Sequence, residues 1–232
     1  MRNRSVHINY QYGLVLQEES QVFKKNIYKR IGLRKIFQNK KVLDLGCGHG
    51  TDSIILAKFA KHVIGVDIRK YKEWKLFESK KIEFIKGNSK KLPFADNTFD
   101  GVYLKDLLHH MKSGVDQAFE EIQRVTKPSG NIVILEANRY NPILFLYATK
   151  LRGHDHFTQK EFSNLIKNNF TKSRFVYLEA YPPFRLPMKI YRIVLALEKR
   201  ISKLHFLKPF FTYNIAIIQN IKTPTKKGNK RK

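Results

Sequence analysis

Short apolar runs alternate along this chain with longer segments whose apolar residues recur at helical spacing. The short runs, bounded by polar and turn-forming residues, predict strands at residues 41–45, 62–66, 82–86, 99–104 and 130–136. The longer segments between them predict helices at residues 51–60, 70–79 and 114–126. Strands that alternate with helices in this way favour an α/β fold, with a parallel sheet and helices on both faces.

The segments on either side of this alternation predict further elements. Before it, apolar residues at near-helical spacing predict one helix over Glu18–Phe37, preceded by a polar arm or partial lid over residues 1–17. After it, we expect an apolar helix over residues 143–150. Residues 173–178 and 210–219 predict a sixth and a seventh strand.

Thr158 has the features of a helix N-cap. Its hydroxyl can accept a hydrogen bond from the first turn of a helix, and Glu161, three residues later, completes a capping box. We therefore expect a helix to begin directly after Thr158, with Phe162, Leu165 and Ile166 on its apolar face.

The first predicted strand runs into a glycine-rich turn. Gly46, Gly48 and Gly50 stand at alternate positions, which allows a tight turn and lets a ligand lie against bare backbone. A dinucleotide site has the spacing G-x-G-x-x-G, in which the last glycine packs a helix on the strand. Thr51 occupies that last position here, so the turn does not predict a pyrophosphate site.

Two acidic residues stand beside this turn. Asp44 precedes it, where a carboxylate would repel a pyrophosphate but can accept hydrogen bonds from a cationic amine. Asp67 ends the second predicted strand, where an acid can accept hydrogen bonds from ribose hydroxyls. Together with the glycines, these acids predict a pocket for an adenosine-bearing cofactor that lacks a pyrophosphate.

In this order and spacing, five segments resemble the class I S-adenosylmethionine (SAM) methyltransferases, in particular the type 11-like enzymes that act on small molecules and lipids. The resemblance covers roughly residues 40–138 and is carried by residues 44–50, 63–67, 82–94, 99–111 and 121–134. One departure is Asn88, which stands where relatives usually carry Asp. An Asn can still accept a hydrogen bond from the adenine amino group, so cofactor binding is not put in doubt.

The resemblance implies a Rossmann-like sheet of seven strands, mostly parallel, whose last strand is antiparallel. It implies SAM as cofactor, with S-adenosylhomocysteine as product. The cofactor contacts that it implies are Asp44, Gly46, Cys47, Gly48, Gly50, Asp67, Ile68, Asn88, Ser89, Leu104 and His109.

With this resemblance, the chain divides into four expected parts. These are an N-terminal arm and helix that act as a lid (1–40), a SAM-binding core (41–138), substrate-recognition helices with the last two strands (139–221), and a basic disordered tail (222–232).

Methyl transfer to a hydroxyl or an acidic carbon requires a base, and histidine suits that task near neutral pH. His109 and His110 open the helix expected after the fourth strand, near the place of the methyl group. We take His110 as the candidate base, with Asp106, His154 and His156 as lesser candidates. In many relatives this histidine pair packs against the cofactor instead. No Cys/His spacing predicts a metal site.

The charge of the chain is strongly basic. It contains 45 Lys and Arg against 19 Asp and Glu, a formal net charge of +26. Such a charge attracts nucleic acids and anionic lipid surfaces. A general enrichment of the chain in Lys explains part of this net charge. It does not explain the clustering, because 13 of the basic residues and only two acids fall between Glu179 and Lys232.

Residues 188–207 predict an amphipathic helix within this basic region. The basic residues Lys189, Arg192, Lys199, Arg200 and Lys203 surround one apolar stripe, with aromatic residues nearby. The stripe consists of Ile190, Ile193, Val194, Leu197 and Ile201. Such a helix can lie in a membrane interface; alternatively, its stripe packs on the sheet and its lysines are solvated.

Two absences narrow the expected acceptor. Enzymes that methylate exocyclic base amines usually carry an Asn/Asp-Pro-Pro-aromatic motif after the fourth strand. At that place this chain has the sequence Leu-Lys-Asp-Leu (residues 104–107), which lacks the motif. Cytosine C5 enzymes need a nucleophilic cysteine, but Cys47 lies in the glycine turn and is the sole cysteine.

A single cysteine forms no internal disulfide, which fits a cytoplasmic location. Neither a long apolar run nor a secretory signal is evident.

Three functions remain open. The first is a methyltransferase with a small-molecule or lipid-linked acceptor, working at an anionic membrane surface, and we prefer it because of the aromatic, basic helix. The second is an RNA- or ribosome-associated methyltransferase, which the charge favours and the missing motif disfavours. The third is a SAM-fold binding module that transfers nothing, against which the intact glycines and acids argue.

Overall fold

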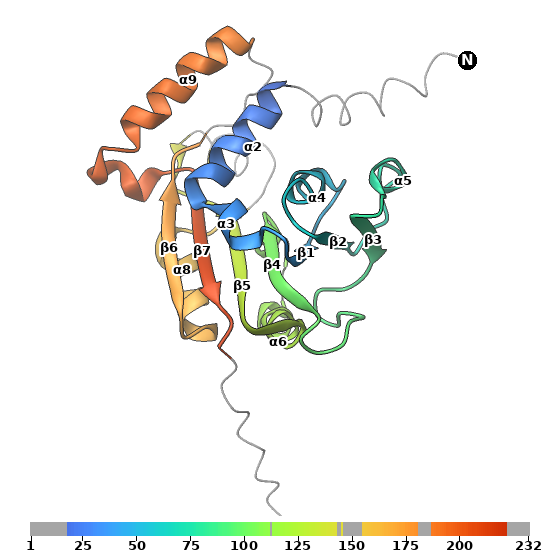
Figure 1. Cartoon of the computed structure of the whole chain (residues 1–232). Helices are drawn as coiled ribbons and strands as arrows, with labels where there is room; N and C mark the ends of the chain where they lie inside the picture. Colours follow the sequence, from blue (N-terminus) through green and yellow to red (C-terminus); the bar gives the residue numbers. More distant parts are fainter. Residues whose placement is uncertain (1–17, 112, 143–144, 146–154, 181–186, 222–232) are drawn as a thin grey trace, which may run out of the picture.

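The computed structural model describes residues 18–111, 113–142, 145, 155–180 and 187–221. Their seven strands form one sheet in the order β3-β2-β1-β4-β5-β7-β6 (Figure 1). Only β7 is antiparallel to its neighbours β5 and β6, which confirms the predicted sheet. The strands are β1 Lys41–Leu45, β2 His62–Asp67, β3 Ile82–Lys86, β4 Phe99–Lys105, β5 Thr126–Ala137, β6 Ser173–Leu178 and β7 Tyr213–Gln219.

The helices agree with the sequence in position but not in length. They are α2 Glu18–Ile31, α3 Leu33–Phe37, α4 Thr51–Leu56, α5 Trp74–Phe77, α6 Val115–Val125, α8 Gln159–Asn169 and α9 Met188–Ile201, with 3₁₀ turns η1 Leu108–His110 and η3 His205–Phe210. The single helix predicted over Glu18–Phe37 is wrong, because Gly32 between α2 and α3 has a left-handed backbone (φ 72°). The helix predicted over 143–150 lies almost wholly outside the described residues, as do the N-terminal arm and the tail.

The predicted bounds of four further elements are wrong. Helices 51–60 and 70–79 are reduced to the shorter α4 and α5. The amphipathic helix ends at Ile201 rather than near 207, and η3 follows it. The last strand therefore begins at Tyr213 instead of 210.

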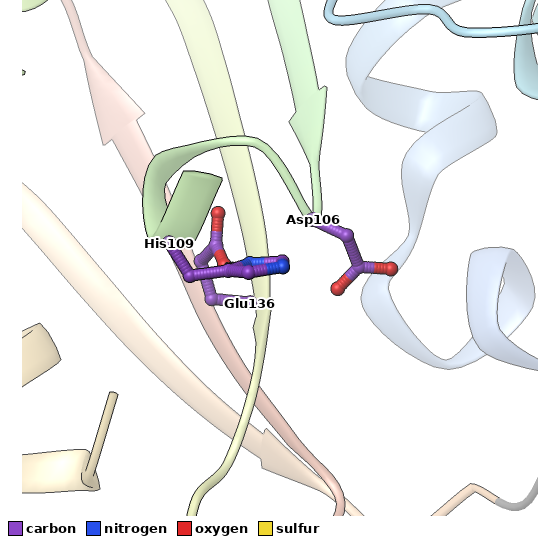
Figure 2. Close-up of side chains that lie close together, drawn as sticks. All are labelled: Asp106, His109 and Glu136. Carbon is purple, nitrogen blue, oxygen red and sulfur yellow. The ribbon is translucent and has the colours of Figure 1, made fainter. Parts of the chain in front are cut away.

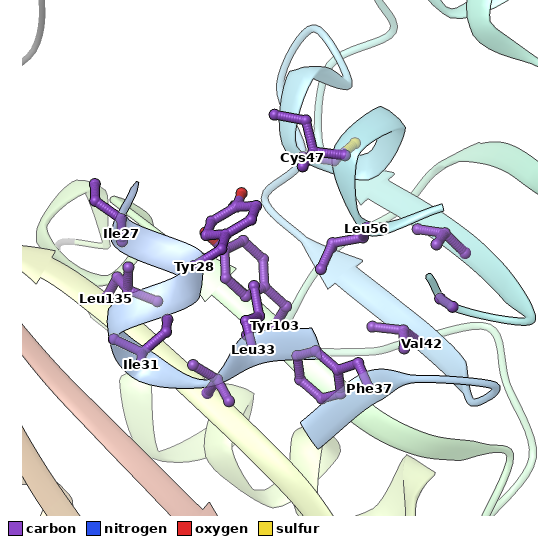
Figure 3. Close-up of a cluster of buried hydrophobic side chains, with 14 of the residues drawn as sticks. Ile27, Tyr28, Ile31, Leu33, Phe37, Val42, Cys47, Leu56, Tyr103 and Leu135 are labelled. Carbon is purple, nitrogen blue, oxygen red and sulfur yellow. Dashed lines mark hydrogen bonds between the residues drawn. The ribbon is translucent and has the colours of Figure 1, made fainter. Parts of the chain in front are cut away.

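Helices cover both faces of the sheet, as predicted (Figure 1). On one face, α2, α3 and α4 bury an apolar cluster that includes Phe37 and Tyr103 (Figure 3). On the other face, α6 and α8 bury a second cluster that includes Phe119 and Phe162. Among the described residues, none of the helices is both long and apolar enough to cross a bilayer.

The close approach of α3 to the sheet depends on Gly101 in β4. A Cβ atom at this position would lie 2.4 Å from the ring of Phe37 and 2.9 Å from the carbonyl oxygen of Asn131. Because the second contact is with backbone, rotation of a side chain cannot relieve it. The glycine therefore lets α3 pack directly on the centre of the sheet, beside β1.

The predicted capping box at the start of α8 is confirmed. The Thr158 hydroxyl accepts a hydrogen bond from the Glu161 backbone N–H at 3.2 Å, and the Glu161 carboxylate accepts one from the Thr158 N–H at 2.8 Å. This cap fixes the start of the helix whose Phe162 and Ile166 are fully buried under β6 and β7.

We expect the Thr158→Ala substitution to lower the free energy of unfolding by about 0.5–2 kcal/mol, because one helix N–H loses its acceptor. Urea denaturation measures this difference. Thr158→Ser keeps the hydroxyl and should remain close to the wild type, so an equal loss in both variants would contradict a role of the cap.

Candidate cofactor and active site

The glycine turn presents an open backbone surface at the carboxyl end of β1. Gly46, Gly48 and Gly50 have positive φ angles of 76°, 51° and 84°, a conformation that other residues rarely adopt. The turn is fixed to the next strand, because the Gly46 N–H donates to the carbonyl of Val66 at 2.8 Å. A Cβ atom on Gly48 would meet nothing within 4 Å, so a ligand can approach the backbone there.

Asp67 ties the end of β2 to this turn. One oxygen of its carboxylate accepts a hydrogen bond from the Gly48 N–H at 2.9 Å, and the other accepts one from the Arg69 N–H at 3.0 Å. Each carboxylate oxygen has a second lone pair. The side chain is thus held in one orientation and can still accept two hydroxyl hydrogen bonds from a ligand.

A pocket of about 390 Å³ lies between these two strand ends and the turn that follows β4. Its volume is within the range of sites for small molecules and cofactors. Of the residues predicted from the sequence, those that line it are Gly46, Asp67, Ile68, Asn88, Ser89 and His110. The pocket also has apolar walls that the sequence did not predict, formed by Leu107 and Met111.

The other predicted cofactor residues lie around the pocket rather than in its lining. Leu104 is fully buried in the core beneath α6 and α8. Gly50 packs against Phe84, whose ring would be 2.5 Å from a Cβ atom at this glycine. Cys47 is buried, and burial raises the pKa of its thiol far above the usual range. Its thiol therefore stays protonated at neutral pH and is a poor nucleophile.

Trp74 supports the turn from α5 and was not predicted from the sequence. Its indole N–H donates to the carbonyl of Gly48 at 2.7 Å, and its ring stacks on Phe84 with centroids 5.2 Å apart. It is the sole tryptophan of the chain, and that rarity was a signal which the sequence analysis did not use.

Asp44 lies below the turn and is 2% exposed. Its carboxyl group accepts a hydrogen bond from the Ser53 hydroxyl at 2.5 Å, which ties β1 to α4. Burial, with a smaller contribution from nearby Asp52, raises the pKa of Asp44 to about 7. The proposal that this group accepts hydrogen bonds from a cationic amine stays a prediction; such an amine would favour its ionised form.

A buried ionic cluster joins α2 to the start of α4. The Lys24 ammonium donates to the Thr51 hydroxyl at 2.7 Å and to the Asp52 carboxylate at 2.9 Å, and the Tyr28 hydroxyl also donates to Asp52. Burial alone would raise the pKa of Asp52, but the cations of Lys24 and Lys105 hold it well below its usual range. The cluster therefore holds α2 against Thr51 and Asp52, the two residues that directly follow the glycine turn.

A second buried pair holds the turn after β4 (Figure 2). One oxygen of Glu136 accepts hydrogen bonds from the backbone N–H groups of Leu107 and Leu108, at 3.0 and 2.6 Å. Its other oxygen lies 2.7 Å from Nδ1 of His109. The Glu136 side chain is completely buried, and that of His109 is 3% exposed. Thus one carboxylate fixes both the backbone and the imidazole of this turn.

The pKa values of both partners are raised. Burial is the main cause for Glu136. For His109, burial works in the opposite direction, but the hydrogen bond and charge of Glu136 outweigh it. Around neutral pH, the pair therefore holds a proton more tightly than the isolated imidazole would.

Over the segments that form this site, the sequence matches known methyltransferases. Residues 43–134 match the family described as "Methyltransferase domain". A sterol 24-C-methyltransferase of Gibberella zeae is 36% identical over 104 residues, which are 41% of this chain and 27% of that protein. Demethylmenaquinone methyltransferase of Staphylococcus aureus is 30% identical over 173 residues, which are 71% of this chain and 67% of that protein. This chain belongs to the class I SAM-dependent methyltransferases.

The methyltransferase fold extends beyond the matched segments. The Burkholderia thailandensis 1,6-didemethyltoxoflavin-N1-methyltransferase, solved with bound S-adenosylhomocysteine, superposes with a TM-score of 0.58 at 16% identity, covering 92% of this chain and 84% of that chain. This likeness concerns the fold alone. The two curated relatives above are covered over only 27% and 67% of their length, so their acceptors are not transferred to this methyltransferase.

SAM is the cofactor of this family, and the described residues fit its adenosine part. The carboxylate of Asp67 lies beside the open backbone of Gly48 and keeps lone pairs that could accept the ribose hydroxyls, so its predicted role stays a prediction. Ile68 lines the pocket and is 64% exposed, which leaves its side chain available for the adenine ring. The oxygen of Asn88 accepts the Lys90 N–H at 3.0 Å and has a second lone pair for the adenine amino group.

The candidate bases differ in where they lie relative to the pocket. His110 lines the pocket, whereas His109 lies behind it with its ring 4.0 Å from that of His110. His156 is buried, and its ring lies 4.3 Å from that of His109. Asp106 directly follows β4 and has a positive φ of 51°. His154 lies outside the described residues.

Asp106, His109 and Glu136 each place one possible ligand atom within 4.8 Å of the others, a distance compatible with a metal ion. Both Glu136 oxygens and Nδ1 of His109 already take part in hydrogen bonds. We therefore derive no metal chemistry from this cluster, and the expected absence of a metal stays a prediction.

We expect the Asp67→Ala substitution to weaken S-adenosylhomocysteine binding by about 10- to 100-fold, because hydrogen bonds to a charged acceptor contribute about 1.5–3 kcal/mol. Isothermal titration calorimetry measures the affinity. Asp116→Ala removes an exposed acid on α6, outside the pocket lining, and should change nothing. Unchanged affinity in a folded Asp67 variant would contradict the placement of the ribose.

Proposed function

We propose that this chain transfers a methyl group from SAM to a small-molecule or lipid-linked acceptor, and that it does so at the surface of an anionic membrane. The observation that carries the membrane part is the exposed apolar and basic surface of α9 and η3. The relatives named above give independent support, because a sterol and demethylmenaquinone are both water-insoluble lipids.

One face of α9 is fixed to the body of the protein. Tyr191 and Glu198 on this face are 0% and 1% exposed, and they lie against α2. Arg30 of α2 donates to the hydroxyl of Ser202 at 2.7 Å and to the carbonyl of Glu179 at 2.6 Å. Because of these contacts, α9 presents its opposite face to the outside in a defined orientation.

The outer face of α9 exposes large apolar side chains. Ile190, Ile193 and Leu197 are 48%, 62% and 48% exposed, and their spacing places them along one stripe of the helix. Phe206 and Phe210 of η3 continue this surface, with 73% and 48% exposure. The sequence analysis left open whether the stripe packs on the sheet; three of its five residues are exposed instead.

Basic side chains flank this apolar stripe. Those of α9, of η3 and of the residues between them are Lys189, Arg192, Lys199, Arg200, Lys203 and Lys208. The sole acid of the two elements, Glu198, is buried. Apolar residues that enter the acyl boundary, surrounded by cations that meet lipid phosphates, are the features of an interfacial helix. An anionic bilayer therefore complements this surface in both polarity and charge.

Replacing Ile190, Ile193 and Leu197 together by Ser should weaken binding to phosphatidylglycerol-containing vesicles at least about tenfold, because half-exposed aliphatic side chains each contribute about 1 kcal/mol when buried. Vesicle co-sedimentation measures this loss. The Leu76→Ser variant changes an apolar residue that is 57% exposed on α5 and serves as the control.

Two results of this experiment would contradict the membrane proposal. One is an intact protein that fails to bind these vesicles; the other is a triple variant that binds as tightly as the wild type. Binding of structured RNA that is lost in the triple variant, without vesicle binding, would favour the RNA-associated function instead.

We expect label from methyl-labelled SAM to enter the lipid fraction of an extract of the source cells. The fractions to separate are lipid, RNA, protein and water-soluble small molecules, and the Asp67→Ala variant is the control that should transfer little. Label in RNA would overturn the proposed acceptor class. Label in water-soluble molecules would keep the methyltransferase function and contradict its membrane setting.

A further inference from the structure

We propose that a groove between α2, α3 and α4 binds a free fatty acid, with its carboxylate between Arg34 and Lys58 and its acyl chain along an apolar floor. The groove has a volume of about 440 Å³ and shares no lining residue with the cofactor pocket. The site is therefore separate from the place of the proposed methyl transfer, and neither proposal depends on the other.

The floor of the groove is apolar. Tyr28 of α2 and Ile55 of α4 line it and are buried, and the half-buried ring of Phe59, which follows α4, lies beside them. The hydroxyl of Tyr28 takes part in hydrogen bonds with Asp52 and Tyr103. Because its polar end is occupied in this way, the groove offers a ligand mainly carbon atoms.

The size of the groove suits a single acyl chain. Its volume lies in the lower part of the range of small-molecule sites. Gly32, between α2 and α3, also lines it, and a Cβ atom at this glycine would meet nothing within 4 Å. The backbone is therefore open to a chain at that end. A phospholipid, with two acyl chains and a glycerol headgroup, exceeds this space.

The walls of the groove are basic. No acidic residue lines it, and all of its basic side chains are exposed. Among the side chains that the structure describes, none of these cations forms an ion pair. They are Lys25, Lys29, Arg34, Lys35 and Lys58. Lysine stems can cover an apolar chain while their ammonium groups remain in water, so the groove complements a ligand that is both apolar and anionic.

The carboxylate fits at one end of the groove. There Arg34 and Lys58 also line a second hollow of about 380 Å³, to which Gln38, Asn39 and Lys61 contribute polar groups. A guanidinium can bind a carboxylate through two parallel hydrogen bonds, and the ammonium of Lys58 supplies a second cation. The charged end of the ligand thus meets the polar hollow, and its chain extends along the apolar floor.

The same cations would attract RNA, but the floor favours the fatty acid. Binding of single-stranded RNA combines cations for the phosphates with aromatic side chains on which bases stack. In this groove Tyr28 is buried and Phe59 is only partly exposed. The phosphates of an RNA would therefore leave the apolar floor unused, whereas an acyl chain covers it.

Isothermal titration calorimetry of the full chain with monomeric dodecanoate tests both the apolar and the charged part of the site. Dodecanoate should bind at least about tenfold more tightly than octanoate, because each methylene group that leaves water strengthens binding roughly fourfold. Dodecyltrimethylammonium has the same chain and the opposite charge, and it should bind more weakly than dodecanoate. Equal affinity for these two probes, or no binding of dodecanoate, would overturn the proposal.

The double variant Arg34→Gln/Lys58→Gln should weaken dodecanoate binding about 3- to 30-fold, because two exposed ion pairs with the carboxylate are lost. The matched control, Lys75→Gln/Lys80→Gln, removes the same charge from exposed positions outside the groove and should bind like the wild type. An equal loss in both double variants would indicate attraction to the net charge alone and would overturn the site.

Photo-cross-linking with a dodecanoate that carries a diazirine at its chain end locates the chain. Mass spectrometry of the digested protein should find cross-links in α2 or in residues 55–59. Cross-links confined to the cofactor pocket would overturn the proposal, as would loss of dodecanoate binding when Ile190, Ile193 and Leu197 of α9 are replaced by Ser. Binding of RNA that the Arg34/Lys58 double variant loses, without any binding of dodecanoate, would replace the fatty acid by RNA.

Discussion

The parallel pairing of β1 with β2 and β4 is the constraint on which the site depends. Leu45 pairs with both Val66 and Leu104, so three strands end at the same level of the sheet. The glycine turn, Asp67 and the turn after β4 each follow one of these strand ends. Because parallel strands direct their carboxyl ends to one edge, residues far apart in the sequence converge there without any contact of their own.

Buried charges then fix the loops at this edge, and they do so in pairs. Asp52 is compensated by Lys24 and by the Tyr28 hydroxyl, and Glu136 by His109 together with two backbone N–H groups. An isolated buried carboxylate would lower the stability of the fold. Removal of one partner from such a pair would leave the other charge buried and uncompensated. The first pair therefore fixes α2 to the start of α4, directly after the glycine turn, and the second fixes the turn after β4, whose Leu107 lines the pocket.

The same helix α2 links the cofactor site to the proposed membrane surface. Its Lys24 contacts the first turn of α4, directly after the glycines, while its Arg30 holds Ser202 at the end of α9. An interfacial α9 would thus place the carboxyl edge of the sheet at a fixed position relative to the bilayer. This continuity would allow a lipid-linked acceptor to reach the site without leaving the membrane completely.

By itself, the sequence determined the succession of strands and helices along the chain, the glycine turn followed by Asp67, and the capping box of α8, because these depend on local spacing and backbone conformation. It placed the apolar stripe of α9 correctly but could not tell which of its residues are exposed, since that depends on where Tyr191 packs. Likewise, Glu136 was only an acid at the end of a strand. Only the pairing of β4 with β5 brings it beside His109, because a register between distant strands is a property of the tertiary structure.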